Sequence, residues 1–426
     1  MYYTGGQMKL ESPTLFAALA CLFVAPAAAL AAPFDPEAAT QAYLATLKGA
    51  ARAQSDAYFE GGYWLLLWGT LAGALADYIL LRTGLSVRFR NWGERLTKRR
   101  FLQSMLYGVP YVIISSAILV PWTIYTGYVR EKQYDLLTQG FGDWAGEQAI
   151  DLAISVIAFS LIIALVMNGI RRSPKRWWLW GTGMAALAIT LFIMIAPVFI
   201  SPLFNTYTEL APGPVRDRIV GMAQSRGIPA DHIYVFDQSK QHKRISANVS
   251  GIGPTIRISL NDNLLNRTTL AETAAVMGHE MGHYVLNHSL KLALGFGLIF
   301  GFCFWIASLV VPGILARWGS IWGLRGIDDV AAWPVYSIVI SVLILAMTPI
   351  KNTLIRTHES EADAFGLDVA REPDGFAQAA MQLSEYRKIE PGPVEEMLFY
   401  DHPSGRTRVR MSMEWKARHI ADPQSK

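Results

Sequence analysis

Six apolar stretches of about 20 residues constrain this chain more than any other feature, because each can cross about 30 Å of hydrocarbon as a helix. They lie near residues 62–82, 105–127, 149–170, 177–203, 292–314 and 331–350. Hydrophobic residues make up 52% of the 426 residues and charged residues only 17%, with a mean hydropathy of +0.25. A soluble domain of average composition does not show these values. The sequence therefore predicts a polytopic membrane protein.

The N-terminus has the layout of a secretory signal peptide. From Met8 onward, a lysine and an apolar stretch precede Ala29-Leu30-Ala31, a small-residue cleavage site. An uncleaved signal anchor is the alternative, and both interpretations place residues 1–32 outside the catalytic unit. The rest of the chain is expected to divide into four spans at 33–203, a catalytic module at 204–291, two spans at 292–350 and a C-terminal catalytic segment at 351–426.

The charge balance and the cysteines exclude several classes of function. The formal net charge is only +4 and the basic residues are scattered, so a nucleic-acid partner is not expected. The two cysteines, Cys21 and Cys303, both lie in apolar stretches and provide neither a disulfide framework nor a thiolate-ligated metal. Any bound metal must use histidine, aspartate or glutamate.

The polar module contains the sharpest motif in the sequence. A helix is expected near residues 215–226, strands at 232–236 and 255–260, and a further helix from about Thr268. This last helix carries His279, Glu280 and His283 in the pattern His-Glu-x-x-His. Because residues four apart share one face of a helix, both imidazoles can bind one Zn²⁺ while Glu280 holds the attacking water.

A catalytic zinc site usually has a third protein ligand besides two histidines. The predicted helix at 355–370 offers four candidates, which are His358, Glu359, Glu361 and Asp363. Spacing alone does not select among them, and a solvated charged face is the alternative interpretation of this segment.

Together these features resemble the type 1 CAAX prenyl endopeptidases, a family of integral-membrane zinc metalloproteases. The resemblance covers roughly residues 105–415. It rests on HEMGH followed by Asn287-His288, on ESEAD at 359–363, on VPWTIYTGYVREKQYD at 120–135, on IAPVFISPLFNTYTEL at 195–210, and on Asp401-His402-Pro403.

The resemblance implies a role for several polar positions. Glu359 matches the family's third zinc ligand, and Asp363 matches an aspartate that orients a ligating histidine. Arg356 and Arg408 match family arginines that we expect to contact the groups around the metal ligands. His402 matches a histidine that contacts the substrate or the reacting carbonyl.

One position departs from the family pattern. The family has Asn-Ala before the edge strand that binds substrate, whereas this chain has Ser246-Ala247 there and Asn248 two residues on. Alternate residues of a strand point to the same side, so Ser246 or Asn248 is expected to bind the substrate backbone. A substrate strand is expected to add to the edge of TIRISL at 255–260.

We therefore expect a mainly α fold, with a polytopic transmembrane helical bundle and a gluzincin-like α+β catalytic module that binds one Zn²⁺. The expected activity is endopeptidase cleavage of membrane-associated or lipid-modified, CAAX-type polypeptides, with Glu280 as general base and His402 at the oxyanion. A quality-control protease of the heat-shock membrane protease type is one alternative, with fewer spans. A transporter or receptor with a structural metal site is another alternative. Asp77 inside a span favours this interpretation, but a structural site gives Glu280 no function.

Positive charges predict the orientation of the protein in the membrane. Lys and Arg crowd two short loops on one side, near residues 82–100 and 171–176, and such loops stay cytoplasmic. Counting spans from these loops puts the catalytic module on the outer side, as a secretory signal also would. We expect a bacterial inner membrane with a periplasmic catalytic module, whereas eukaryotic members of the family present these segments to the cytosol.

Overall fold

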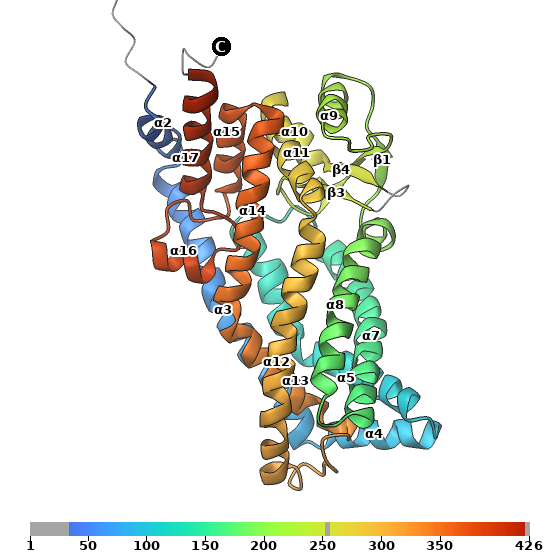
Figure 1. The fold of residues 1–426 in the computed structure, drawn as a ribbon. Coiled ribbons are helices and arrows are strands. Elements are labelled where there is room, and N and C mark those ends of the chain that lie inside the picture. Colours follow the sequence, from blue (N-terminus) through green and yellow to red (C-terminus); the bar gives the residue numbers. More distant parts are fainter. Residues whose placement is uncertain (1–33, 252–255, 422–426) are drawn as a thin grey trace, which may run out of the picture.

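The computed structural model describes residues 34–251 and 256–421 (Figure 1). The predicted signal segment at 1–32 lies outside the described residues. The rest is mainly helical with one small sheet, which confirms the predicted fold class. The proposed division into four regions stays a prediction.

Long apolar helices form the membrane part of the molecule. Those long and apolar enough to span a membrane alone are α3 (Gly49–Arg82), α5 (Arg100–Ile124, continued to Gln133 by a π turn and α6, Arg130–Gln133), α7 (Phe141–Arg172) and α12 (His288–Trp318). Two further stretches are bent, namely α8 (Trp177–Ile195) with the turns up to Leu203, by 44°, and α13 (Trp333–Ala346) with α14 (Thr348–Ala370), by 55°. Each of the six predicted spans overlaps one of these stretches, but the last, at 331–350, covers only α13 and the first residues of α14.

Asp77, the acidic residue inside a predicted span, is hydrogen-bonded to a neighbouring helix. Asp77 on α3 is only 5% exposed, and it accepts a hydrogen bond of 2.7 Å from the Tyr111 hydroxyl on α5. The carboxyl group therefore joins two helices, which satisfies a buried polar group without a transported ion.

A four-stranded sheet covers one side of the metal-motif helix, α11 (Leu270–Val285). The strands are β1 (Tyr207–Glu209), β2 (Ile233–Phe236), β3 (Ala247–Ser250) and β4 (Arg257–Asn261), in the order β1-β2-β4-β3. The pair β2–β4 is parallel and the other pairs are antiparallel. The helices α9 (Pro214–Ser225) and α10 (Asp262–Arg267) pack on the same apolar core, which includes Ile219, Ile258 and Leu264.

The strand order corrects one expectation about substrate binding. TIRISL at 255–260 lies largely in β4, and β2 and β3 occupy both edges of that strand. Its residues Ile258 and Leu260 are fully buried, as a central strand requires. A substrate cannot add to β4, and the free edge next to α11 belongs to β3.

Sequence signals set the ends of the metal-motif helix. The Thr269 side chain accepts from the backbone N–H of Glu272, and the Glu272 carboxylate accepts from the backbone N–H of Thr269, so a capping box begins α11. After Val285 the chain turns at Asn287, which has a left-handed φ of 55°, and enters the spanning helix α12 at once.

Shorter helices complete the catalytic end. In Figure 1 they lie on the side of α11 and α14 away from the sheet, while α4 (Leu85–Leu96) lies at the far end of the molecule. They are α2 (Pro36–Leu44), α15 (Pro373–Leu383), α16 (Pro393–Phe399) and α17 (Gly405–Lys416).

Candidate metal centre

Small residues let α11 and α14 approach each other at backbone distance. A Cβ atom added to Gly278 would lie 2.9 Å from the carbonyl oxygen of Gly366, and one added to Gly282 would lie 3.0 Å from the Cα of Ala362. We call these four residues the small-residue seam. Any larger side chain there would push the helices apart, so the seam fixes the distance between residues that α11 and α14 direct at each other.

Three potential ligand atoms converge beside this seam. The Nε2 atoms of His279 and His283 lie 3.0 Å apart, and Glu359 places its carboxylate oxygens 3.3 Å and 3.4 Å from them, respectively. All three donor atoms lie within 4.8 Å of one another. The structure therefore brings Glu359 to the two histidines.

The other three candidates for a third ligand have different partners. Asp363 bonds to His279 Nδ1 at 2.7 Å, Glu361 bonds to His288 Nε2 at 3.0 Å, and the His358 ring bonds to the Leu354 carbonyl at 2.7 Å.

The hydrogen bonds assign the protons of both histidines in the motif. A carboxylate only accepts, so His279 carries a proton on Nδ1 and donates it to Asp363. His288 likewise donates from Nε2 to Glu361, which leaves its Nδ1 to accept from His283 Nδ1 at 3.0 Å. Both Nε2 atoms consequently face the same point, where a metal ion would replace any proton that they carry.

A cation fits this arrangement. Two imidazole nitrogens 3.0 Å apart repel each other unless a proton or a metal ion lies between them, and the carboxylate oxygens of Glu359 lie 3.3 Å and 3.4 Å from these nitrogens. Burial lowers the pKa of His279, but Asp363 outweighs that effect and raises this pKa to about 10. The site therefore favours positive charge, and two imidazoles with one carboxylate are ligands that zinc accepts.

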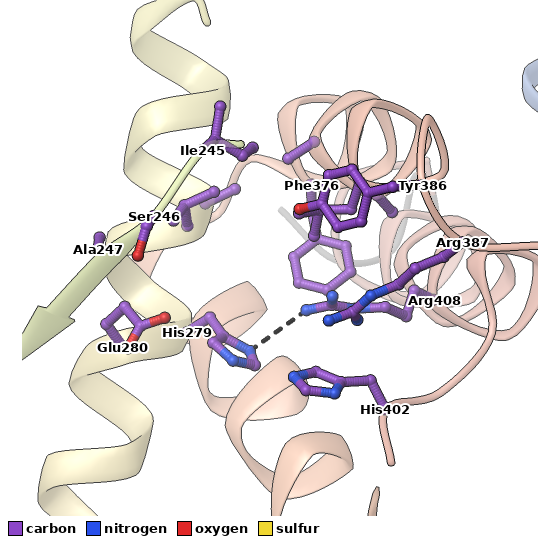
Figure 2. A pocket seen from close by; sticks show the side chains of 15 residues that line it. Ile245, Ser246, Ala247, His279, Glu280, Phe376, Tyr386, Arg387, His402 and Arg408 are labelled. Carbon is purple, nitrogen blue, oxygen red and sulfur yellow. Dashed lines mark hydrogen bonds between the residues drawn. The ribbon is translucent and has the colours of Figure 1, made fainter. Parts of the chain in front are cut away.

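A buried ion pair between Asp363 and Arg408 contacts His279 at Nδ1, the ring nitrogen that does not face the other ligands. Asp363 is fully buried and accepts from Arg408 on α17 through Nε at 3.0 Å and Nη2 at 2.5 Å. Figure 2 also marks a 3.4 Å contact between Arg408 and His279 Nδ1. Because this nitrogen is already a donor, the two groups share the Asp363 carboxylate and do not bond to each other.

Arg356 has a different position from the one expected. In the described chain its Nη1 donates to the carbonyls of Glu396 at 2.9 Å and Tyr400 at 2.5 Å. It therefore holds the segment that leads to His402, and it acts on the metal ligands only through that segment.

A cavity of about 170 Å³ opens at the ligands (Figure 2). Glu280 and His402 line it from opposite sides. Burial raises the pKa of Glu280, whereas burial and the charge of Arg387 lower the pKa of His402. The His402 ring bonds through Nδ1 to Asp401 at 2.8 Å and places Nε2 3.2 Å from Glu359 Oε2.

Ser246, directly before the edge strand β3, and Asn248, within it, have different surroundings. Ser246 lines the cavity, and its backbone N–H donates to the Asn261 side chain at 3.0 Å. Asn248 does not line the cavity, and its buried Oδ1 has no partner within the described ranges. The structure thus brings Ser246 to the metal centre and leaves Asn248 within the sheet, opposite Ser259.

Sequence reasoning assigned no role to His288 or to the small-residue seam. His288 and Glu361 orient His283 in the same way that Asp363 orients His279. The seam has a recognisable signal, because Gly278 and Gly282 on one helix, and Ala362 and Gly366 on the other, are each four residues apart.

Two family models match consecutive parts of the chain. Peptidase family M48 matches residues 210–416, and the CAAX prenyl protease N-terminal family, described as five membrane helices, matches residues 42–206. The second match favours the CAAX-type branch over the heat-shock type.

Individual relatives agree with these matches. An uncharacterized metalloprotease of Bacillus subtilis, YhfN, is 29% identical over 85% of this chain and 86% of its own length. CAAX prenyl protease 1 of Saccharomyces cerevisiae is 25% identical over 68% of each chain. The crystal structure of S. mikatae Ste24p has the same fold, with a TM-score of 0.69 and 20% identity over 89% of this chain and 94% of that one.

The two family models together extend over most of the described chain, and the metalloprotease motif at residues 279–283 lies within the match to peptidase family M48. The chain therefore belongs to the CAAX prenyl protease group of peptidase family M48, and it is a multi-pass membrane metalloendopeptidase.

Proposed function

We propose that the metal is Zn²⁺, held by His279, His283 and Glu359. The observation that carries this proposal is the convergence of three donor atoms within 4.8 Å, with both imidazoles oriented so that Nε2 faces the same point. Three protein ligands with a fourth position for water are typical of catalytic zinc, whereas structural zinc has four. Zn²⁺ in such a site supplies polarisation of the scissile carbonyl and acidification of a water molecule.

Glu280 and His402 would carry out the proton transfers and the oxyanion contact. Burial raises the pKa of Glu280, which makes its carboxylate a better proton acceptor than a solvated glutamate. Glu280 takes the proton of the attacking water and delivers it to the leaving nitrogen. His402 donates from Nδ1 to Asp401, so Nε2 carries a proton only when the ring is cationic; in that form it donates to the developing oxyanion.

The substrate is inferred to bind as a strand beside β3. This strand is the sheet edge next to the cavity, and Ser246 directly before it lines the cavity. Backbone pairing at an edge gives affinity with little demand on sequence. Because the yeast relative is a CAAX prenyl protease, we infer that the substrates are membrane-associated polypeptides, including lipid-modified proteins with a C-terminal CAAX-type motif.

The catalytic end is inferred to face the periplasm of a bacterial inner membrane. Support comes from the basic loops, since residues 82–100 surround α4, which lies at the end of the molecule away from the sheet (Figure 1). Short basic loops stay cytoplasmic. Alkaline phosphatase fused after Lys426 should be active, and a fluorescent protein there should be dark; the reverse result would contradict this orientation.

Glu280→Gln tests the enzymatic proposal. The variant should keep its zinc, because no ligand changes, and should lose cleavage of casein or a fluorogenic peptide, because the base is gone. Glu385→Gln is a matched control, since this exposed glutamate pairs with Arg267 away from the cavity. Activity of Glu280→Gln equal to that of the wild type would end the proposed mechanism.

A further inference from the structure

A second cavity adjoins the catalytic one and is larger, at about 560 Å³. The two cavities share wall residues, which are Ile245, Ser246, Tyr386 and Arg387. The second cavity, here called the side cavity, is otherwise lined by α3, by α6, by the loop at 238–244, by the start of α14 and by the segment before His402. A polypeptide that passes Ser246 at the catalytic cavity can therefore continue into the side cavity.

The lining of the side cavity has more positive than negative groups. Arg130, Arg244, Lys351 and Arg387 line it, whereas Asp401 is the one carboxylate among its described lining residues. His242 also lines it, but burial lowers the pKa of this imidazole to about 4, so the ring is neutral at physiological pH.

Two of these cations, Arg130 and Arg244, already have partners in the protein. Arg130 and Arg244 both pair with Glu131, at 3.9 Å and 2.5 Å. The Arg130 guanidinium also lies 4.0 Å from the centre of the Tyr58 ring. These two side chains therefore form a structural network between α3, α6 and the loop before β3.

Lys351 and Arg387 differ from these two arginines. Both are only partly exposed, and neither side chain has an ion pair or a hydrogen bond with any residue in the described part of the chain. Asp401, whose pKa both cations help to lower, is engaged by His402 at 2.8 Å. A partly buried cation without a counterion is unfavourable, so the pair attracts an anion into the side cavity.

We propose that Lys351 and Arg387 bind the free C-terminal carboxylate of the substrate. The inference rests on the proposed function, because it takes the substrate to be a polypeptide that is cut beside Ser246. Figure 2 shows that Arg387 extends from the side opposite Ser246 toward the space next to His402. Arginine pairs well with a planar carboxylate, and Lys351 adds a second charge from α14. The site would thereby select cleavage close to a chain end over cleavage within a chain.

Two fluorogenic peptides of one sequence test this proposal, one ending in a carboxylate and the other in a carboxamide. The full-length wild type in liposomes should cleave the acid with a kcat/KM about 10- to 100-fold above that of the amide, as expected for a charge-assisted contact. In Lys351→Met and Arg387→Gln this ratio should fall toward 1, while Lys351→Arg should largely restore it. Lys240→Met is the matched control, because this exposed lysine lies outside both cavities and should keep the wild-type ratio.

The outcomes separate this proposal from the proposed function. Equal cleavage of acid and amide by the wild type overturns carboxylate recognition and leaves the endopeptidase assignment intact. A preference for the acid that persists in both Lys351→Met and Arg387→Gln also overturns it. If anionic lipid changes the rates on both peptides equally and the two variants abolish that effect, then the cations bind a lipid headgroup and the proposal is wrong. If the wild type cleaves neither peptide, both carboxylate recognition and the proposed endopeptidase function are overturned.

Discussion

Replacing Asp363 by asparagine tests how the buried ion pair supports the metal centre. The wild-type carboxylate accepts from His279 at 2.7 Å and from Arg408 at 3.0 Å and 2.5 Å. In Asp363→Asn one oxygen remains for these donors, and the new amide group is itself a donor. His279 and Arg408 then compete for a single uncharged oxygen, so the proton on His279 Nδ1 is held less firmly, and Arg408 loses its carboxylate.

Two different losses follow, with separate magnitudes. Loss of a carboxylate that orients a ligating histidine should weaken metal binding about 10- to 100-fold, or about 1.4–2.8 kcal/mol. The Arg408 side chain is only 9% exposed. Leaving such a charge unpaired should lower the free energy of unfolding by about 3–5 kcal/mol. The double variant Asp363→Asn/Arg408→Met removes the stranded charge, so it should regain stability without regaining metal affinity.

Chelator competition measures the metal affinity, and thermal unfolding in detergent measures the stability. Asp368→Asn is the matched control, because Asp368 lies on the same helix and accepts from Trp415 Nε1 at 2.7 Å, away from the ligands. A metal affinity of Asp363→Asn within about threefold of the wild type would refute the orienting role. Recovery of affinity in the double variant would show that the loss came from misfolding.

Glu359→Ala should lose its bound metal, whereas Glu361→Ala should retain it, because Glu361 reaches the centre only through His288; metal content after gel filtration distinguishes them. His288→Phe removes the acceptor of His283 Nδ1 and should lower metal affinity about 10- to 100-fold in chelator competition. Because burial lowers the pKa of His402, which must be protonated to donate from Nε2, kcat/KM should fall as pH rises through this pKa. His402→Gln donates an amide N–H at every pH and should remove that alkaline limb. The first expectation is wrong if Glu359→Ala keeps its metal, and the second is wrong if His288→Phe binds metal as tightly as the wild type. The third is wrong if the kcat/KM of His402→Gln still falls at alkaline pH.

Local geometry determined which features were predictable. His279 and His283 share a helix face because four residues make about one turn, and the apolar stretches of about 20 residues fix the spans by length alone. The identity of the third metal ligand could not be predicted from spacing, because it depends on how α14 packs against α11. That packing comes from the small-residue seam. The edge strand was misjudged for a similar reason: strand order arises from pairings that are distant in sequence, such as β2 with β4.

The small-residue seam has a consequence for metal exchange. The spacing of the ligands follows from backbone contact between two helices, and one of them continues into a bent span while the other leads directly into α12. Little of the metal's binding free energy is then needed to fold the scaffold, in contrast to zinc fingers, which are unfolded without metal. The centre should behave as a preformed receptor for divalent ions, from which a chelator removes the bound metal and Co²⁺ replaces it in the folded protein.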